Sequence, residues 1–128
     1  MRHPLNRPTD VELSILRALW DLGPATVRQV HEVLGADRDL AYTAVLKMMQ
    51  TMVDKGLLLR DEAGRSHVYR PSQAREHTLK HLVDDLLERA FGGSALDLLA
   101  TTLASRKLAT SEREEISQLL MKAKEKRP

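Results

Sequence analysis

The hydrophobic period of the chain changes at Gly56, and this change is what most constrains the fold. Before it, apolar residues recur at helical spacing in three short runs joined by short polar links. After it, residues 57–60 and 66–70 flank the polar loop Asp-Glu-Ala-Gly-Arg, which is typical of a β-hairpin. Three helices followed by a hairpin predict a winged helix-turn-helix domain.

Local signals mark where these helices begin and end. Thr9 is placed to cap a helix over residues 9–22, and Glu12, three positions later, can close a capping box. The third helix is expected from about residue 40 to residue 55, because Gly56 suits the left-handed position beyond a helix end. The sequence therefore predicts a compact trihelical unit ahead of the hairpin.

The third helix has one apolar and one mixed face. The apolar face is expected to be buried, since methionine fills irregular gaps in a core, and it comprises Ala41, Val45, Met48, Met49, Met52 and Val53. In a helix-turn-helix protein the opposite face enters the major groove, where residues near its N-terminus contact base edges. On that face, Leu46 suits either a thymine methyl or the core margin. The other members are Thr43, Lys47, Gln50, Thr51 and Asp54.

The hairpin supplies a modest basic patch. Arg65 lies next to its tip, from which it can reach a phosphate or the minor groove. Two acidic residues, Asp61 and Glu62, share the same loop and reduce the local positive charge. The other basic side chains of the hairpin are Arg60, His67 and Arg70.

Residues 72–128 are predicted to form a helical dimerisation domain, separate from a DNA-binding domain over residues 1–71. A long amphipathic helix is broken at Gly92-Gly93-Ser94, and two further helical runs start near residues 95 and 110. A self-contained small helical bundle is the alternative. The apolar positions expected at the dimer interface are Leu79, Leu82, Val83, Leu86, Leu87, Phe91, Leu99, Leu103, Ile116, Leu119 and Leu120.

Composition excludes several classes of protein. Without cysteine, the chain has no disulfides, thiolate nucleophiles or cysteine-based metal sites, which suits a reducing cytoplasm. No apolar run is long enough for membrane insertion. The net charge is only +2, so any contact with a polyanion must be local. No catalytic motif is present, so neither an enzyme nor a cofactor is predicted.

His77 and His81 are four positions apart, as a helical metal-binding pair would be. Two ligands do not close a metal site, and the nearby Asp84 and Asp85 are as easily explained as the solvated side of the same helix. A pH-sensitive dimer seam is a third interpretation. No metal is predicted.

Two long runs carry a family resemblance: PTDVELSILRALWDLGPATVRQVHEVL and DLAYTAVLKMMQTMVDKGLLLRDEAGRSHVYRP. Residues 8–71 resemble the penicillinase-repressor family of winged-helix regulators, the BlaI and MecI type. The resemblance implies a homodimeric repressor that binds a palindromic double-stranded DNA operator and controls resistance or stress genes. Base contacts would then fall on Thr43 and Ala44. The full predicted DNA-binding set is Tyr42, Thr43, Ala44, Leu46, Lys47, Gln50, Thr51, Arg65 and His67.

The chain departs from the family pattern at several positions. Ala44 stands where many relatives have threonine, and Thr51 where some have arginine. The resemblance implies a membrane sensor-protease as a partner, but the Asn-Phe pair cleaved in the best-known relatives is replaced by Thr-Thr-Leu at residues 101–103. The copper-sensing chemistry of one branch needs cysteines that this chain lacks. The alternative function is a winged-helix protein-interaction module without specific DNA binding.

Overall fold

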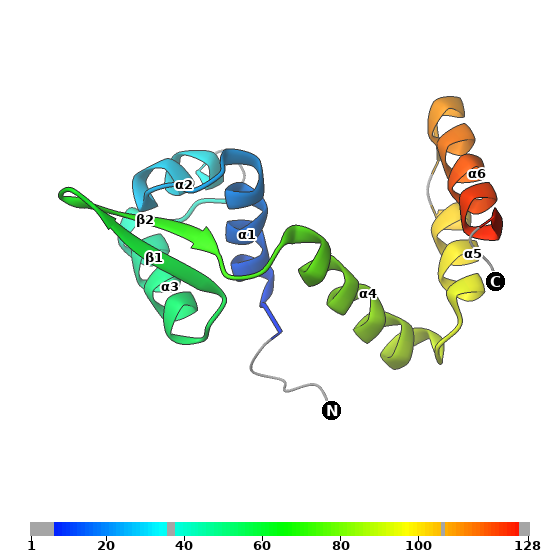
Figure 1. The fold of residues 1–128 in the computed structure, drawn as a ribbon, viewed down its shortest axis with the longest axis horizontal. Coiled ribbons are helices and arrows are strands. Elements are labelled where there is room, and N and C mark those ends of the chain that lie inside the picture. Colours follow the sequence, from blue (N-terminus) through cyan, green and yellow to red (C-terminus); the bar gives the residue numbers. More distant parts are fainter. Residues whose placement is uncertain (1–6, 36–37, 106, 126–128) are drawn as a thin grey trace. The chain divides into compact units, whose positions relative to one another are not determined.

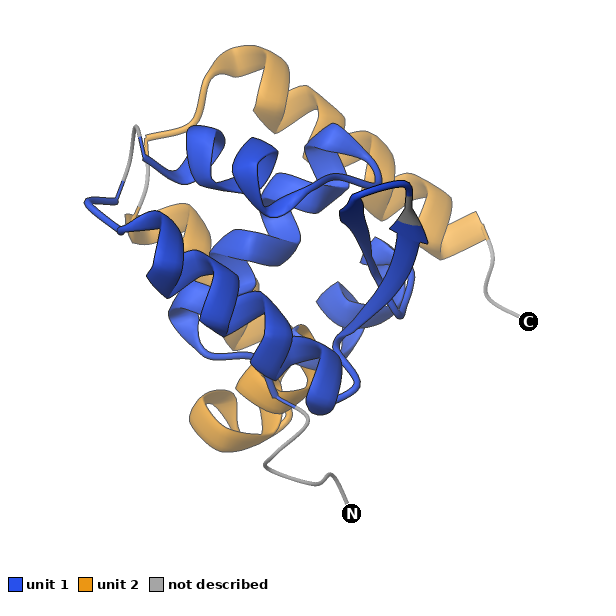
Figure 2. Cartoon of the chain, turned by 90° about the vertical axis from the view of Figure 1, so that its left-hand side faces the viewer, with its two compact units in different colours: residues 1–82 blue, residues 83–128 orange. Residues whose placement is uncertain are grey.

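The computed structural model describes residues 7–35, 38–105 and 107–125. It confirms the mainly helical fold with a small hairpin wing, and two compact units are distinguished, Met1–Leu82 and Val83–Pro128 (Figures 1 and 2). The boundary between these units falls within a helix, so the division into domains at residue 71 stays a prediction. The elements are α1 (Asp10–Leu22), α2 (Val27–Leu34), α3 (Tyr42–Asp54), β1 (Leu58–Ala63), β2 (Ser66–Pro71), α4 (Arg75–Phe91), α5 (Ala95–Ser105) and α6 (Thr110–Glu125).

Both of the first two helices begin with a complete capping box. The hydroxyl of Thr9 accepts a hydrogen bond from the Glu12 amide at 3.2 Å, and the Glu12 carboxylate accepts one from the Thr9 amide at 2.9 Å. Thr26 and Gln29 form the same reciprocal pair at α2. These bonds satisfy amides that have no partner within the helix. The predicted cap of α1 is thus confirmed.

The hydrophobic core lies between α1, α2, α3 and the hairpin. In α3, Val45, Met49 and Met52 are buried, while Met48 and Val53 are half-buried and pack against the core. The prediction that Ala41 is buried was wrong: α3 begins at Tyr42, and Ala41 is its exposed N-cap. The buried apolar residues are Ile15, Leu16, Ala18, Leu19, Ala25, Val27, Val30, Leu34, Val45, Met49, Met52, Leu58 and Tyr69.

The hairpin is longer and its turn shorter than the sequence indicated. The strands pair antiparallel from Leu58–Pro71 to Ala63–Ser66, leaving only Gly64 and Arg65 in the turn. Gly64 has φ +65, as the first position of a type II′ turn requires. Asp61 and Glu62 therefore lie in β1, and their assignment to a loop was wrong.

Tyr69 anchors the hairpin to the helices. Its side chain is buried in the core. Its amide donates to the Ala25 carbonyl at 2.8 Å, and its carbonyl accepts from the Ala25 amide at 3.0 Å. The link between α1 and α2 thus pairs with β2 through an isolated bridge at Ala25, while the turn of the hairpin projects beyond the helices (Figure 1).

The last three helices bury none of their side chains. The predicted break between α4 and α5 is confirmed, with positive φ at Gly92 and Gly93. No residue of α4, α5 or α6 is buried. Whether these helices form a dimerisation domain or a self-contained bundle stays a prediction. The most exposed large apolar side chains are Leu96, Leu119, Met121 and Leu120.

No helix in the described ranges is both long and apolar enough to cross a membrane.

Candidate nucleic-acid interface

The exposed face of α3 lies opposite its buried face. Thr43, Lys47, Gln50 and Thr51 are exposed and follow one another at helical spacing, so their side chains share one side of the helix. Leu46 is half-buried and packs against the core, as the core-margin alternative proposed. The exposed face consists of Tyr42, Thr43, Ala44, Lys47, Gln50, Thr51 and Asp54.

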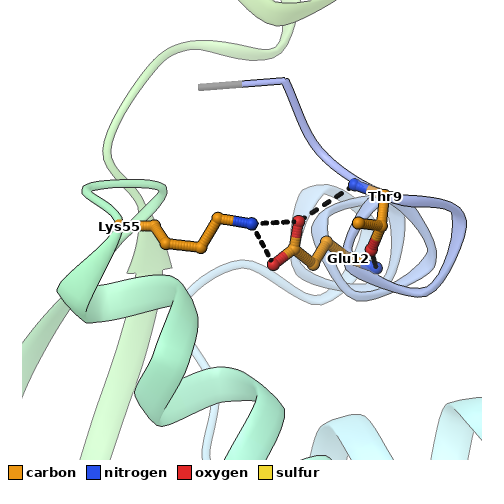
Figure 3. Close-up of polar contacts among 3 residues, drawn as sticks. All are labelled: Thr9, Glu12 and Lys55. Carbon is orange, nitrogen blue, oxygen red and sulfur yellow. Dashed lines mark hydrogen bonds and ion pairs between the residues drawn. The ribbon is translucent and has the colours of Figure 1, made fainter. Parts of the chain in front are cut away.

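A partly buried ion pair holds the C-terminal end of α3 to the start of α1 (Figure 3). The Lys55 ammonium donates to both carboxylate oxygens of Glu12, at 3.0 and 2.8 Å. Glu12 is only 2% exposed and the Lys55 side chain 27%. Because the same carboxylate also accepts from the Thr9 amide, the cost of burying its charge is offset by three hydrogen bonds. The pair therefore restricts how α3 sits against α1.

Sequence reasoning missed this pair. It assigned Glu12 only to the capping box and Lys55 only to the end of a helix. The two residues are 43 positions apart, beyond any local spacing rule. The available signal was that Glu12 lies next to the apolar stripe of α1, where an acidic side chain needs a partner.

At the other end of α3, a histidine of α2 contacts the residues that flank the N-cap. His31 Nε2 lies 2.8 Å from the carbonyl oxygen of Leu40. Its ring also meets the ring of Tyr42 edge-on, with centroids 5.9 Å apart and an interplanar angle of 85°. Sequence reasoning assigned no role to His31, since these contacts depend on how α2 and α3 pack together.

The basic side chains of the wing are not equivalent. Arg70 Nε lies 3.2 Å from Asp61 Oδ2. Because the two side chains form this exposed ion pair, the charge of Arg70 is already neutralised. His67 lies opposite Glu62 in the strand pairing. Arg60 and Arg65 have no ion-pair partner within the described residues, and the same holds for Lys47 on α3. The positive charge that the wing can offer to DNA is therefore smaller than its four basic side chains would suggest.

The two histidines of α4 lie close together. The rings of His77 and His81 have centroids 4.4 Å apart. Across the part of the chain that the structure describes, no group of three or more His, Cys, Asp or Glu side chains could hold a metal ion. The pair carries no assignment as a metal site.

A family model described as penicillinase repressor matches residues 8–122. The chain belongs to the penicillinase repressor family. This match extends well beyond residues 8–71, on which the sequence resemblance rested, and reaches into α6. Penicillinase repressors are regulators rather than enzymes, which agrees with the absence of a catalytic motif.

One individual relative agrees with this assignment. The chain is 41% identical over 87 residues to the transcriptional regulator BlaI of Mycobacterium tuberculosis, covering 67% of this chain and 63% of that regulator. It therefore spans less than two thirds of the length of this relative. An uncharacterised 16.5 kDa protein of Latilactobacillus sakei is 23% identical over 120 residues, which cover 94% of this chain and 82% of that protein.

Among solved structures, one similar chain is Bacillus licheniformis BlaI, in its monomeric form in complex with the blaP half-operator. The TM-score is 0.49 at 22% identity, covering 54% of this chain and 84% of that chain.

Proposed function

We propose that this penicillinase repressor family member is a sequence-specific DNA-binding transcriptional repressor with α3 in the major groove. The observation that carries the proposal is the α3 face opposite the core, where side chains suited to bases and phosphates are exposed together. The name of the Mycobacterium tuberculosis relative, a transcriptional regulator, supports it. Repression would follow from occupying a promoter.

The exposed residues of α3 divide by chemistry. Thr43 and Gln50 have hydrogen-bond donors and acceptors for base edges. The methyl group of Ala44 can make only an apolar contact, for example with a thymine methyl group. Lys47 and Thr51 suit phosphate oxygens, and Arg65 at the hairpin turn suits a phosphate or the adjacent minor groove. Since phosphate contacts position the protein and base contacts specify the sequence, Thr43, Ala44 and Gln50 would determine the operator sequence.

The active form in this proposal is a homodimer. The apolar side chains of α4, α5 and α6 are exposed or half-buried in the single chain; Leu96 is 77% exposed and Leu119 is 64% exposed. Exposed large apolar side chains of this kind are typical of an interface between proteins. A second copy would cover it and present two α3 helices to successive major grooves, about 34 Å apart on a palindrome. The predicted interface set, from Leu79 to Leu120, is the part of the chain expected to pair.

The test is a fluorescence anisotropy titration of the full chain with a duplex from the promoter upstream of its own gene, beside a scrambled duplex. We expect tighter binding to the promoter duplex. Replacing Lys47 or Arg65 with alanine should weaken binding to both duplexes and lower the slope of log K against log salt by about 0.9 per lost phosphate contact.

Arg70→Ala is the matched control, because it removes the same charge from a side chain already paired with Asp61. We expect it to change the salt slope less than Arg65→Ala does. Equal affinity of the wild-type chain for promoter and scrambled duplexes would reject the repressor. An unchanged salt slope in the Lys47 and Arg65 variants would favour the alternative function, a protein-interaction module. No structural observation favours that alternative.

The proposal places the protein in the cytoplasm, where its DNA would be. A membrane sensor-protease is a separate hypothesis about release from the operator. Residues 101–103 lie inside α5, so cleavage there would require the helix to unwind locally, because a protease needs an accessible extended backbone. Intact chain after exposure of the producing cells to a β-lactam, seen by immunoblot, would count against this partner.

A further inference from the structure

The three helices around the core begin differently. α1 and α2 each start with a capping box, in which a threonine side chain satisfies a backbone amide. The N-cap of α3 is Ala41, whose methyl side chain makes no capping hydrogen bond. Alanine is among the weakest residues at this position. The helix that presents the candidate base-contacting residues is thus the one without a cap of its own.

His31 contacts the backbone immediately before this uncapped end. The Leu40 carbonyl oxygen, 2.8 Å from His31 Nε2, can only accept a hydrogen bond, so Nε2 must carry the hydrogen. The bond spans nine positions and is partly buried. It therefore ties the segment entering α3 to the last turn of α2.

The same imidazole also contacts the first residue of α3. The ring of Tyr42 meets it edge-on, in the T-shaped arrangement that favours aromatic contacts. Leu40 and Tyr42 lie on either side of Ala41, and the Leu40 side chain packs against the core. One side chain of α2 thus holds both neighbours of the uncapped position.

We propose that His31 is a positioning residue for DNA recognition: its Nε2–H bond and ring contact hold the first turn of α3, with Thr43 and Ala44, in place against α2. The effect of His31 on DNA recognition rests on the proposed function, because residues at this end of a recognition helix contact base edges. The physical part, that His31 holds the first turn, does not depend on DNA.

The first experiment uses the full chain without DNA and measures amide hydrogen exchange by NMR. The amides of Ala44 and Val45 both donate to the Ala41 carbonyl at 3.1 Å. His31→Ala should speed their exchange by about threefold to tenfold, the effect of losing one partly buried hydrogen bond. The Leu13 amide, which donates to the Thr9 carbonyl at the start of α1, should exchange at the wild-type rate.

Two further variants separate the bond from the ring. His31→Gln keeps an N–H donor at similar reach and should restore slow exchange. His31→Phe keeps a ring but no donor, so its exchange should stay closer to that of His31→Ala than to the wild-type rate. Val33→Ala, at an exposed apolar position of the same helix, is the control for disturbing α2. Wild-type exchange at Ala44 and Val45 in His31→Ala, or rescue by phenylalanine but not glutamine, would overturn the proposal.

The second experiment adds the promoter and scrambled duplexes. His31→Ala should lose about threefold to tenfold in affinity for the promoter duplex only, with an unchanged salt slope, because a misplaced first turn affects base contacts more than phosphate contacts. Equal losses on both duplexes would indicate general destabilisation and refute a positioning role. If the wild-type chain fails to distinguish the duplexes while the exchange results hold, the proposed function is wrong and the contact of His31 with α3 stands.

Discussion

The winged-helix elements and the tail helices show the same apolar periodicity but use it differently. In α1, α2 and α3 the stripes meet one another and the hairpin, and residues such as Ile15 and Val30 are fully buried within one chain. In α4, α5 and α6 no residue is buried. An amphipathic pattern therefore predicts that a face will be covered, without saying whether the same chain covers it.

The largest expected difference concerns matched leucine truncations in the two regions. Leu19 is 1% exposed and Leu120 is 55% exposed. Leu19→Ala should lower the free energy of unfolding by about 4 kcal/mol, because it removes buried contacts and leaves a cavity. Leu120→Ala should instead weaken self-association by roughly tenfold. Urea unfolding at two protein concentrations, with sedimentation equilibrium, measures both effects.

The comparison fails if Leu120→Ala lowers stability as much as Leu19→Ala at every protein concentration. That result would mean that the tail helices bury their apolar face within one chain. A dimer constant unchanged by Leu120→Ala would remove Leu120 from the predicted interface.

The next effect tests the ion pair that closes the winged-helix unit. Lys55→Met leaves the Glu12 carboxylate buried beside a single amide donor, and should cost about 3 kcal/mol of stability. Glu12→Gln should cost less, because the Lys55 side chain is partly exposed and can reach water. Chemical denaturation at neutral pH gives both values, and a larger loss for Glu12→Gln would show that the carboxylate is not the constrained partner.

What could be predicted from the sequence follows the range of the interactions. The caps at Thr9 and the left-handed Gly56 depend on a few adjacent residues, and both are confirmed, with φ +84 at Gly56. The paired strands extend further than predicted because Gly64 permits a two-residue turn. Contacts between elements, such as Glu12 with Lys55, were missed because packing alone brings them together.

The candidate site shows the same limit. Helical periodicity placed Thr43, Lys47 and Gln50 on the face away from the core, and the structure has them exposed. It could not show that Arg70 is paired with Asp61, because that pair depends on strand register. Which of the exposed residues contact DNA stays a prediction.

The smallest expected effect concerns Ala41. Its backbone has φ −70 and ψ 150, the extended conformation of an N-cap, so a serine there can accept a hydrogen bond from the first turn without rearrangement. Ala41→Ser should raise the free energy of unfolding by about 1 kcal/mol, as chemical denaturation would show, and leave self-association unchanged. If His31 compensates for the missing cap, His31→Ala should also cost less in the Ala41→Ser background than in the wild type. Additive effects of the two substitutions would show instead that His31 and the N-cap act independently, since residues sharing one structural task are expected to couple.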